Sequence, residues 1–316
     1  MKLLVVADPL DSFKLYKDST YAMLRAADRR GHALHACGIA DLLWRDGVVQ
    51  ARACPIRMTG SEPDWYAAGT PAWTALAAYD AVLMRKDPPF DAAYLNATYL
   101  LEIAERGGAR VFNAPRALRD YNEKLAIARF PAFIVPTLVT CQASVIREFL
   151  AAQGDIVVKP LDAMGGSGVF RLRPGDPNLG AILETVTELG TRQVMAQRFI
   201  PEIVAGDKRI LLIDGEPVPY CLARIPAPGE TRGNLAAGGS GVARPLSARD
   251  REIAASLGPR LQQDGLLLVG LDVIGDWLTE VNVTSPTCFR EITDQTGFDV
   301  AARFVDALER RAAEAR

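Results

Sequence analysis

Short apolar runs alternate with helical patterns over the first 120 residues, and this alternation limits the fold more than any other feature of the sequence. The runs Lys2–Ala7 and Ala81–Met84 are too short for buried helices, and stretches of helical periodicity follow them at Asp18–Arg30 and Ala92–Arg106. Buried strands that alternate with helices are typical of an α/β unit with a mostly parallel sheet. We therefore expect an α/β domain over residues 1–120.

The pattern changes in the rest of the chain, which has 316 residues in all. Asp155–Pro160 and Val169–Leu172 are short strands joined by a glycine-rich turn, and Leu266–Ile274 and Trp277–Val283 are two strands joined by Gly275-Asp276. Such hairpins indicate α+β architecture. Residues from Pro226 to Gly241 are rich in Gly, Pro and Ala and have no periodicity, so they predict a long loop, which in a compact domain is usually a lid.

Composition excludes several classes of protein. With 36 basic and 38 acidic residues the chain is not built to bind polyanions, so we expect no nucleic-acid partner. No apolar run approaches the roughly 20 residues that span a bilayer, and Asp8 comes too early for a signal peptide. Five scattered cysteines and only two histidines indicate neither a disulfide framework, nor a zinc site, nor a histidine-dependent triad. We expect a cytoplasmic protein with no membrane partner.

A glycine-rich turn follows Lys159 at the end of a strand. Gly165, Gly166, Ser167 and Gly168 bring backbone N–H groups and a hydroxyl close together, and the lysine adds a point charge, which together suit a phosphate. The segment is neither a P-loop nor a dinucleotide fingerprint. A plain glycine hairpin with an exposed lysine explains it equally well.

Three oxygen-bearing side chains lie on the last predicted hairpin. Asp272 and Glu280 can lie opposite one another, and Glu280 and Asn282 are two apart on one strand and therefore share a face. Two carboxylates and an amide oxygen suit Mg²⁺, which also binds substrate phosphates. The alternative is the polar outer face of a hairpin, but the flanking strands look buried, and buried acids need a partner or a cation.

Several arginines lie where a ligand would bind. Arg209 and Arg224 begin or end apolar strands, and forked donors at those positions can neutralise a transferring phosphoryl group. Arg85 follows a strand of the first domain, at the carboxyl end where open α/β sheets bind ligands. It can hold a substrate carboxylate or belong to a charged loop. Arg232 lies in the long loop.

The sequence resembles the bacterial glutathione synthetases, which are ATP-grasp ligases, essentially from end to end. Seven segments carry the resemblance in the right order: Met84–Phe90 (MRKDPPF), Asn122–Lys124 (NEK), Lys159–Gly166 (KPLDAMGG), Gly206–Arg209 (GDKR), Gly215–Pro226 (GEPVPYCLARIP), Glu230–Gly239 (ETRGNLAAGG) and Thr279–Cys288 (TEVNVTSPTC). The resemblance implies an N-terminal Rossmann-like (pre-ATP-grasp) domain at 1–120, then an ATP-grasp fold with a central lid subdomain at 121–200 and a C-terminal subdomain at 201–316 with a mobile loop at 225–241.

The same resemblance implies an activity. The family joins γ-glutamylcysteine to glycine and converts ATP to ADP and phosphate, with Mg²⁺ or Mn²⁺, through an acyl phosphate. We expect these small molecules as partners, and a homo-oligomer. The other possibilities are another ATP-grasp carboxylate–amine ligase, or a nucleotide-binding regulator of this fold without catalysis.

The resemblance also implies site residues. Nucleotide binding falls to Lys124, Lys159, Gly165, Gly166, Ser167, Gly168, the hinge Gln197, Arg198, Phe199 and Ile200, and the ribose-binding acid Asp207. Metal binding falls to Asp272, Glu280 and Asn282, the transferred phosphate to Arg209 and Arg224, and substrate binding to Arg85, Arg232, Asn234 and Ser285. The chain departs from the family pattern at Ala163 and Ser240, where glycine and arginine are common.

Overall fold

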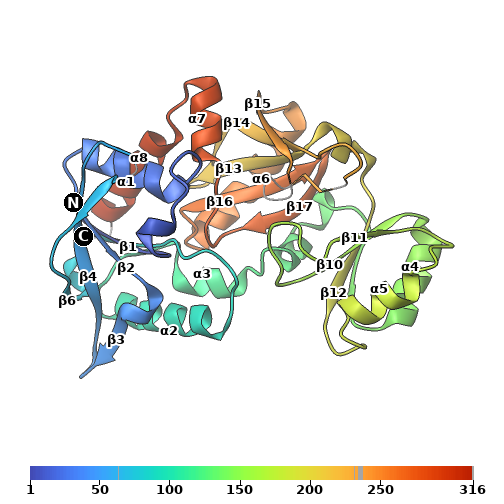
Figure 1. The fold of residues 1–316 in the computed structure, drawn as a ribbon, viewed down its shortest axis with the longest axis horizontal. Coiled ribbons are helices and arrows are strands. Elements are labelled where there is room, and N and C mark those ends of the chain that lie inside the picture. Colours follow the sequence, from blue (N-terminus) through green and yellow to red (C-terminus); the bar gives the residue numbers. More distant parts are fainter. Residues whose placement is uncertain (63, 231, 234–237, 315–316) are drawn as a thin grey trace.

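The computed structural model describes residues 1–62, 64–230, 232–233 and 238–314, which are arranged around three β-sheets (Figure 1). The strands are β1 (Lys2–Val6), β2 (Ala33–Cys37), β3 (Leu42–Arg45), β4 (Val48–Met58), β5 (Tyr66–Ala68), β6 (Ala72–Ala75), β7 (Ala81–Met84), β8 (Val111–Phe112), β9 (Thr137–Thr140), β10 (Ile156–Pro160), β11 (Phe170–Leu172), β12 (Val194–Arg198), β13 (Asp207–Ile213), β14 (Glu216–Ile225), β15 (Ser240–Pro245), β16 (Leu268–Ile274) and β17 (Trp277–Asn282). The helices are α1 (Ser19–Arg29), α2 (Ala92–Arg106), α3 (Pro115–Asp120), α4 (Ala143–Gln153), α5 (Leu179–Val186), α6 (Ala248–Gln263), α7 (Phe289–Thr296) and α8 (Val300–Glu314).

The first sheet is only partly parallel. Its main path runs β3-β4-β2-β1-β7-β8, and β5 and β6 also pair with β4. The parallel part, β2-β1-β7-β8, is the predicted α/β unit, whereas β3 to β6 pair antiparallel. Within β1, Leu3 and Val5 face one hydrophobic core and Leu4 and Val6 face another, so the strand is buried on both sides.

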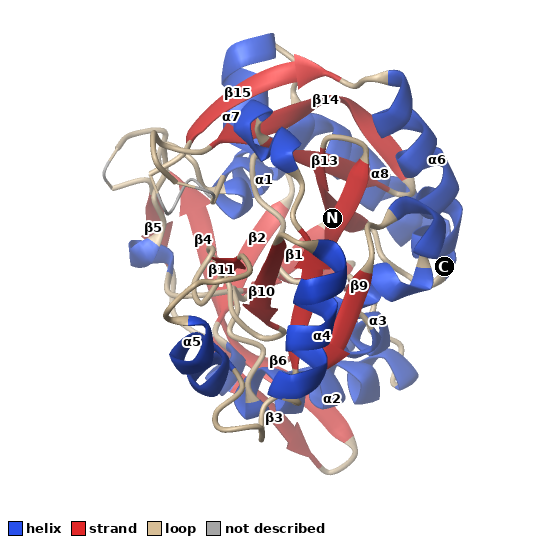
Figure 2. Ribbon diagram, turned by 90° about the vertical axis from the view of Figure 1, so that its right-hand side faces the viewer, coloured by secondary structure: helices blue, strands red, loops and turns tan. Residues whose placement is uncertain are grey.

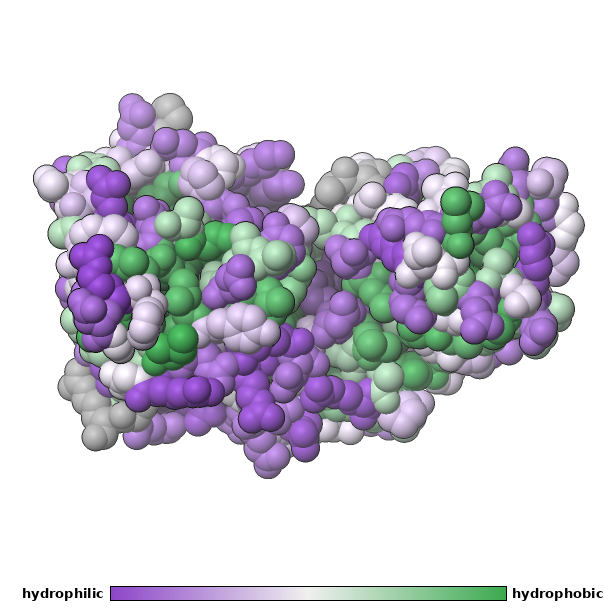
Figure 3. All heavy atoms as spheres, turned by 90° about the horizontal axis from the view of Figure 1, so that it is seen from below, coloured by the Kyte–Doolittle hydropathy of each residue, from purple (hydrophilic) through white to green (hydrophobic). Residues whose placement is uncertain are grey.

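The central sheet is a small layered unit with its own core. Its strands run in the order β11-β10-β12-β9 and are all antiparallel. Helices α4 and α5, which face the viewer in Figure 2, contribute Ile146, Leu150 and Leu183 to a core closed by Ile156 and Val158 of β10. Seen from below, the molecule narrows to a waist between this lobe and the rest of the chain (Figure 3).

The third sheet, in the order β15-β14-β13-β16-β17, carries apolar residues on both faces. Ile210 and Leu212 of β13 pack with Leu257 of α6 in one core. On the opposite face Leu211 and Ile213 pack in a second core with α7 and α8. Asp207 and Arg209 share that second face, because side chains on a strand alternate. The end of β13 that carries Asp207 and Arg209 extends beyond the helices and borders a cavity.

The loop between β14 and β15 is shorter than the sequence analysis predicted. Ile225 pairs with Ser240 and Arg224 with Gly241, so these residues belong to strands and the loop spans residues 226–239. Mobility of this loop stays a prediction, and residues 231 and 234–237 within it lie outside the described residues. Within the described ranges, no helix is both long and apolar enough to cross a membrane.

Candidate active site

A cavity of about 570 Å³ lies where the three sheets meet. One wall comes from β10, β12 and the glycine-rich turn, a second from β13, β16 and β17, and a third from loops of the N-terminal domain. Most of the site residues predicted from sequence line this cavity, although they come from positions 124 to 285 of the chain. The fold therefore brings them into one site.

Four charged residues form a paired network on the floor of the cavity. Arg209 and Asp272 lie opposite each other on β13 and β16, and Arg209 donates through Nε to Asp272 Oδ1 (2.5 Å) and through Nη2 to Oδ2 (3.1 Å). Asp207 and Arg224 lie opposite each other on β13 and β14, and their side chains form an ion pair. Arg224 Nη2 is also 2.9 Å from Asp272 Oδ2, which links the two pairs.

Burial and pairing shift the pKa values of the two acids in opposite directions. Burial opposes ionisation of Asp272, but the guanidinium groups of Arg209 and Arg224 outweigh it and hold the pKa of this carboxyl well below its usual range. Burial dominates at Asp207, where Arg224 offsets it only in part, and raises the pKa to about 6. Asp207 Oδ1 is buried and has no hydrogen-bond partner among the described residues, so an acceptor is available there.

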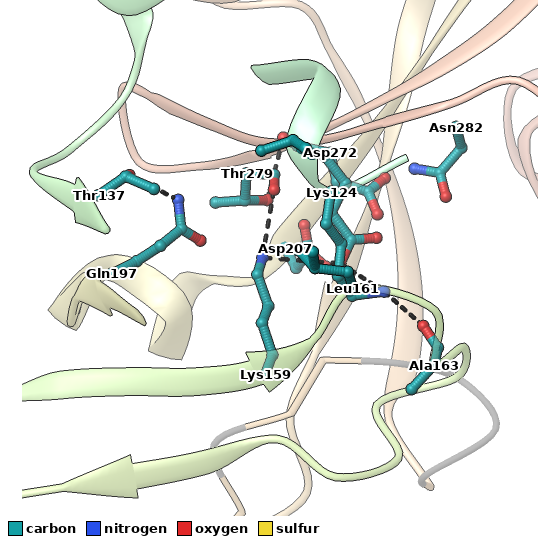
Figure 4. Close-up of polar contacts among 12 residues, drawn as sticks. Lys124, Thr137, Lys159, Leu161, Ala163, Gln197, Asp207, Asp272, Thr279 and Asn282 are labelled. Atoms are coloured by element: carbon teal, nitrogen blue, oxygen red, sulfur yellow. Dashed lines mark hydrogen bonds and ion pairs between the residues drawn. The ribbon is translucent and has the colours of Figure 1, made fainter. Parts of the chain in front are cut away.

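Two lysines approach the same floor from the central domain. Lys159 ends β10 and donates to the Thr279 carbonyl (3.2 Å), and Lys124 donates to the Ala163 carbonyl (Figure 4). Each ammonium is 3.7 Å from Glu280 Oε1. Burial lowers the pKa of Lys159, although Glu280 counteracts it. The floor thus gathers four cationic side chains, which can contact the oxygens of an anionic ligand.

The three predicted metal ligands occupy neighbouring positions. Asp272 lies opposite Glu280, as the hairpin pattern indicated, and Asn282 is two residues beyond Glu280 on β17. Asn282 Nδ2 donates to the Gly270 carbonyl (3.2 Å), so its amide oxygen is the atom left for a ligand. An ionised carboxylate accepts about four hydrogen bonds, and the guanidinium contacts of Asp272 use three of these positions.

These donors fit a metal that shares its ligands with a phosphate. Within the described residues, no group of three or more His, Cys, Asp or Glu is arranged to hold a metal ion. A cation held here therefore needs oxygen ligands from a bound molecule as well. Mg²⁺ commonly binds through one or two carboxylates plus substrate phosphates.

The glycine-rich turn forms a rim of the cavity. Gly165, Gly166 and Ser167 line it, and both glycines adopt the left-handed conformation (φ 64° and 82°). Gly168 is outside the lining, because its Cα faces Pro160, whose Cγ would be 2.9 Å from a Cβ at that position. We interpret Gly168 as the residue that lets the turn return against β10.

The predicted hinge lines an apolar part of the cavity at the end of β12. Gln197, Arg198, Phe199 and Ile200 all border it, together with Val157, Val169 and Ile274. The Gln197 side chain donates through Nε2 to Thr137 Oγ1 (3.1 Å; Figure 4). The Arg171 guanidinium is 3.5 Å from the centroid of the Phe199 ring and pairs with Asp155, which fixes this wall.

The predicted substrate-binding residues are not all in the cavity. Ser285 and Arg232 line it, and Arg232 Nη1 reaches the Gly166 carbonyl (3.5 Å). Asn234 lies outside the described residues. Arg85 is buried behind the wall and is not among the lining residues, and it donates to Thr20 Oγ1 (3.1 Å) and the Pro286 carbonyl (3.0 Å). The structure thus places Arg85 beneath the 284–288 segment rather than in the open site.

Sequence reasoning missed other residues of the cavity. Glu123 ties its segment to the residues that follow β17, since its carboxylate accepts from the backbone N–H groups of Val283 and Thr284 (both 3.1 Å). Lys17 and Glu291 also line the cavity. Glu123 lies in the Asn122–Lys124 segment, which carries part of the family resemblance, but no local pattern marks Lys17 or Glu291, because they reach the cavity only through long-range packing.

Comparison with known proteins agrees with the fold. The family described as prokaryotic glutathione synthetase, N-terminal domain, matches residues 1–119, and the one described as prokaryotic glutathione synthetase, ATP-grasp domain, matches residues 123–297. A glutathione synthetase of Ralstonia nicotianae is 60% identical over 315 residues, covering 100% of this chain and 97% of the relative. One from Nitrosomonas europaea is 60% identical over 316 residues, with 99% of each chain covered.

Solved structures share the fold at low identity. D-cycloserine synthetase DcsG superposes with a TM-score of 0.69 and 18% identity, covering 98% of this chain and 99% of that one. The ATP-grasp ligase PsnB, in a complex with minimal precursor, Mg and ADP, superposes with a TM-score of 0.63 and 19% identity, with 98% of each chain covered. At such identities the likeness shows the ATP-grasp fold and nothing about the substrate.

Proposed function

This chain belongs to the prokaryotic glutathione synthetase family, and on that basis we propose how its cavity carries the reaction. The protein is an ATP-dependent ligase that joins γ-glutamylcysteine to glycine and yields glutathione, ADP and phosphate. The observation that best supports the site assignment is the convergence, within one cavity, of Lys124 and Lys159 on Glu280 and of Arg209 and Arg224 on Asp272. The 60% identity with glutathione synthetases favours this substrate over those of other ATP-grasp ligases.

We propose that the phosphates of ATP lie between the two lysines and the glycine-rich turn. Lys124 and Lys159 are buried and each approaches one carboxylate, so a phosphate offers them a stronger partner than water does. The backbone at Gly165, Gly166 and Ser167 adds N–H donors on the open side. Arg209 and Arg224 are held rigidly by two aspartates and offset charge as the γ-phosphoryl group moves.

We propose that the hinge binds the adenine of the nucleotide and that Asp207 binds its ribose. Residues 197–200 with Val157, Val169 and Ile274 form an apolar slot suited to adenine. Asp207 Oδ1, which is buried without a partner among the described residues, offers an acceptor for a ribose hydroxyl. These assignments are proposals supported by placement and chemistry.

We propose Glu280, Asn282 and Asp272 as the residues that hold Mg²⁺ (or Mn²⁺). Glu280 supplies a carboxylate and Asn282 an amide oxygen, and Asp272 retains one acceptor position beside the arginines. When bound, the cation would supply positive charge that offsets the negative charge developing on the transferred phosphoryl group.

The reaction needs no nucleophile from the protein. A cysteinyl carboxylate oxygen attacks the γ-phosphorus and ADP leaves, which forms an acyl phosphate. The uncharged glycine amine then attacks the acyl carbon, loses a proton, and phosphate leaves with the oxygen that came from the carboxylate. Water would destroy the acyl phosphate, so the site must close. We propose that Arg232 and Asn234 contribute to that closure, and that Ser285 and, from behind the wall, Arg85 position the dipeptide.

We also propose domain boundaries at residues 120 and 200, cytoplasmic location, and a homo-oligomeric state without nucleic-acid or membrane partners. The strands of the three sheets lie within residues 2–112, 137–198 and 207–282, which supports the boundaries. Trp44 and Trp73 of the first sheet are 54% and 51% exposed, which supports association between copies. Light scattering of the purified protein tests the oligomeric state.

Phosphate release tests the function, with each substrate omitted in turn. Glutathione should form only when ATP, γ-glutamylcysteine and glycine are all present. With ¹⁸O in the cysteinyl carboxylate, one labelled oxygen should appear in the released phosphate. If all the label stays in the peptide product, the acyl phosphate is contradicted. If phosphate is released equally fast with and without the dipeptide, the ligase assignment is contradicted.

A further inference from the structure

Glu123 lines the cavity, but the proposed reaction gives it no part. It lies in the segment that leads from α3 to the central domain, and its side chain is half-buried. It directly precedes Lys124, so its place in the fold is tied to that of a residue we assign to phosphate. Its contacts, however, are with the strand that carries the metal-binding residues.

Glu123 satisfies the open edge of β17. This strand is the last in the third sheet, with β16 on one side only. Alternate N–H groups of an edge strand point away from the sheet and need another acceptor. The Glu123 backbone carbonyl accepts from the Val281 N–H (2.8 Å), and its Oε1 accepts from the Val283 N–H (3.1 Å). Glu123 thus takes the place of a neighbouring strand.

The two anchored residues flank Asn282 on either side. Thr284 strengthens the anchor, because its N–H (3.1 Å) and its Oγ1 (2.7 Å) donate to the same carboxylate oxygen of Glu123. Asn282 itself donates through Nδ2 to the Gly270 carbonyl (3.2 Å), which leaves its amide oxygen for a ligand. The backbone before and after Asn282 is therefore fixed by Glu123, and the amide oxygen takes its position from that backbone.

The neighbours of Glu123 contact a different domain. Asn122 donates through Nδ2 to the Leu161 carbonyl (3.2 Å), and Lys124 donates through Nζ to the Ala163 carbonyl (Figure 4). Both acceptors lie between β10 and the glycine-rich turn. Three consecutive residues therefore join the metal-site strand, through the middle one, to the phosphate-binding turn, through the outer two.

The contacts of Glu123 call for an acceptor at a fixed place. Its described partners are two N–H groups and a hydroxyl, all neutral and all on one oxygen. A neutral amide oxygen at the same position accepts the same bonds. A metal ligand or a base would instead depend on the carboxylate charge. Reach and charge can therefore be separated by substitution.

Resting on the proposed assignment of Asn282 to the metal, we propose that Glu123 is a positioning residue that acts through Asn282. It holds the Asn282 amide oxygen at the distance from Lys124 that a phosphate-bound Mg²⁺ requires. Residues that orient a metal ligand commonly affect metal affinity roughly 10- to 100-fold when they are replaced.

The Mg²⁺ dependence of ADP binding tests this role without turnover. Titration calorimetry at a series of Mg²⁺ concentrations, with EDTA as the zero point, gives the concentration that produces half of the gain in ADP affinity. Glu123→Ala should raise this concentration roughly 10- to 100-fold. Glu123→Gln keeps the acceptor and should stay near the wild type. Glu123→Asp keeps the charge but is one methylene shorter, so it should resemble Glu123→Ala.

A double-mutant cycle tests whether Glu123 acts through Asn282. Asn282→Ala should itself raise the Mg²⁺ concentration, and adding Glu123→Ala should raise it little further, because the residue being positioned is gone. Asp250→Ala is the matched control for lost stability. Asp250 is a buried acid that accepts from the Ser247 N–H (2.9 Å) away from the cavity, so urea unfolding should detect its loss while the Mg²⁺ dependence stays unchanged.

A Glu123→Gln variant as impaired as Glu123→Asp overturns the proposal, since the charge would then be what matters. Equal effects of Glu123→Ala with and without Asn282 also overturn it, as does an equal Mg²⁺ shift in Asp250→Ala. The Gln and Asp variants decide the question even if Glu123→Ala fails to fold. Failure of the metal assignment is a separate outcome, in which Asn282→Ala keeps the wild-type Mg²⁺ dependence.

Discussion

Replacing Lys159 by methionine should weaken nucleotide binding without weakening the fold. The ammonium is buried and donates to the Thr279 carbonyl at 3.2 Å, and in the complex we expect it to contact a phosphate. A hydrogen bond to a charged group contributes about 1.5–3 kcal/mol, so the Kd for ADP should rise roughly 10- to 150-fold. Methionine fills most of the space of the lysine stem.

The stability of the free protein should respond differently. Burial lowers the pKa of Lys159 below the ordinary 10.5, so the charged form destabilises the fold at every pH below the folded-state pKa. This destabilisation disappears as the pH rises from the folded-state pKa of Lys159 to the ordinary value of 10.5. The methionine variant lacks the cost but loses one hydrogen bond of about 1 kcal/mol. At pH 7 its unfolding free energy should therefore match the wild type to within about 1 kcal/mol or exceed it.

Titration calorimetry with ADP and Mg²⁺ measures the first quantity, and urea unfolding measures the second. Lys208→Met is the contrasting control, because Lys208 pairs with the buried Asp250 away from the cavity. It should leave ADP affinity unchanged and destabilise the fold by about 3–5 kcal/mol, since it leaves a buried carboxylate unpaired. Unchanged ADP affinity in Lys159→Met refutes the phosphate role, and a large stability loss refutes the desolvation argument.

Other residues give shorter predictions. Glu280→Gln should raise the Mg²⁺ concentration for half-maximal rate at least roughly 10-fold, and a metal titration that matches the wild type removes Glu280 from the metal site. Arg85→Ala should raise KM for γ-glutamylcysteine but not for ATP, and equal rises would mark a purely structural residue. Gly233→Ala should lower kcat with an unchanged melting temperature, because its Cβ would collide with the Arg224 carbonyl oxygen and the loop must move; a normal rate would show that this close approach is unnecessary.

Local signals predicted some elements to the residue and missed others. The strand Ala81–Met84 and the helix Ala92–Arg106 were predicted with the observed bounds. Asp91 caps that helix by accepting from the Tyr94 N–H, and glycines follow its end. Residues next to each end therefore mark where the helix begins and where it stops. By contrast, β3 to β6 and α7 and α8 were not predicted. The long strand Val48–Met58 mixes small and polar residues, and pairing with four other strands stabilises it.

The contacts of the site residues likewise include some that the sequence predicts and some that it does not. Asp272 and Glu280 are joined by a tight turn, so their juxtaposition could be predicted and the strand register confirms it. The contacts of Asp272 with Arg209 and Arg224 depend on strands more than 40 residues apart in the sequence, and no local pattern encodes that pairing. Arg85 was correctly placed after a strand, but its direction is set by Thr20 and Pro286 from distant segments.

The packing of α8 ties the last residues of the chain to the first. Phe304 and Leu308 share a core with Leu3 and Val5, and Arg30 pairs with Asp306. During synthesis the N-terminal sheet therefore leaves the ribosome long before the helix that covers it. The first domain must keep an apolar face uncovered until α8 has been synthesised, so a message truncated near residue 299 should yield a product that chaperones retain or proteases remove.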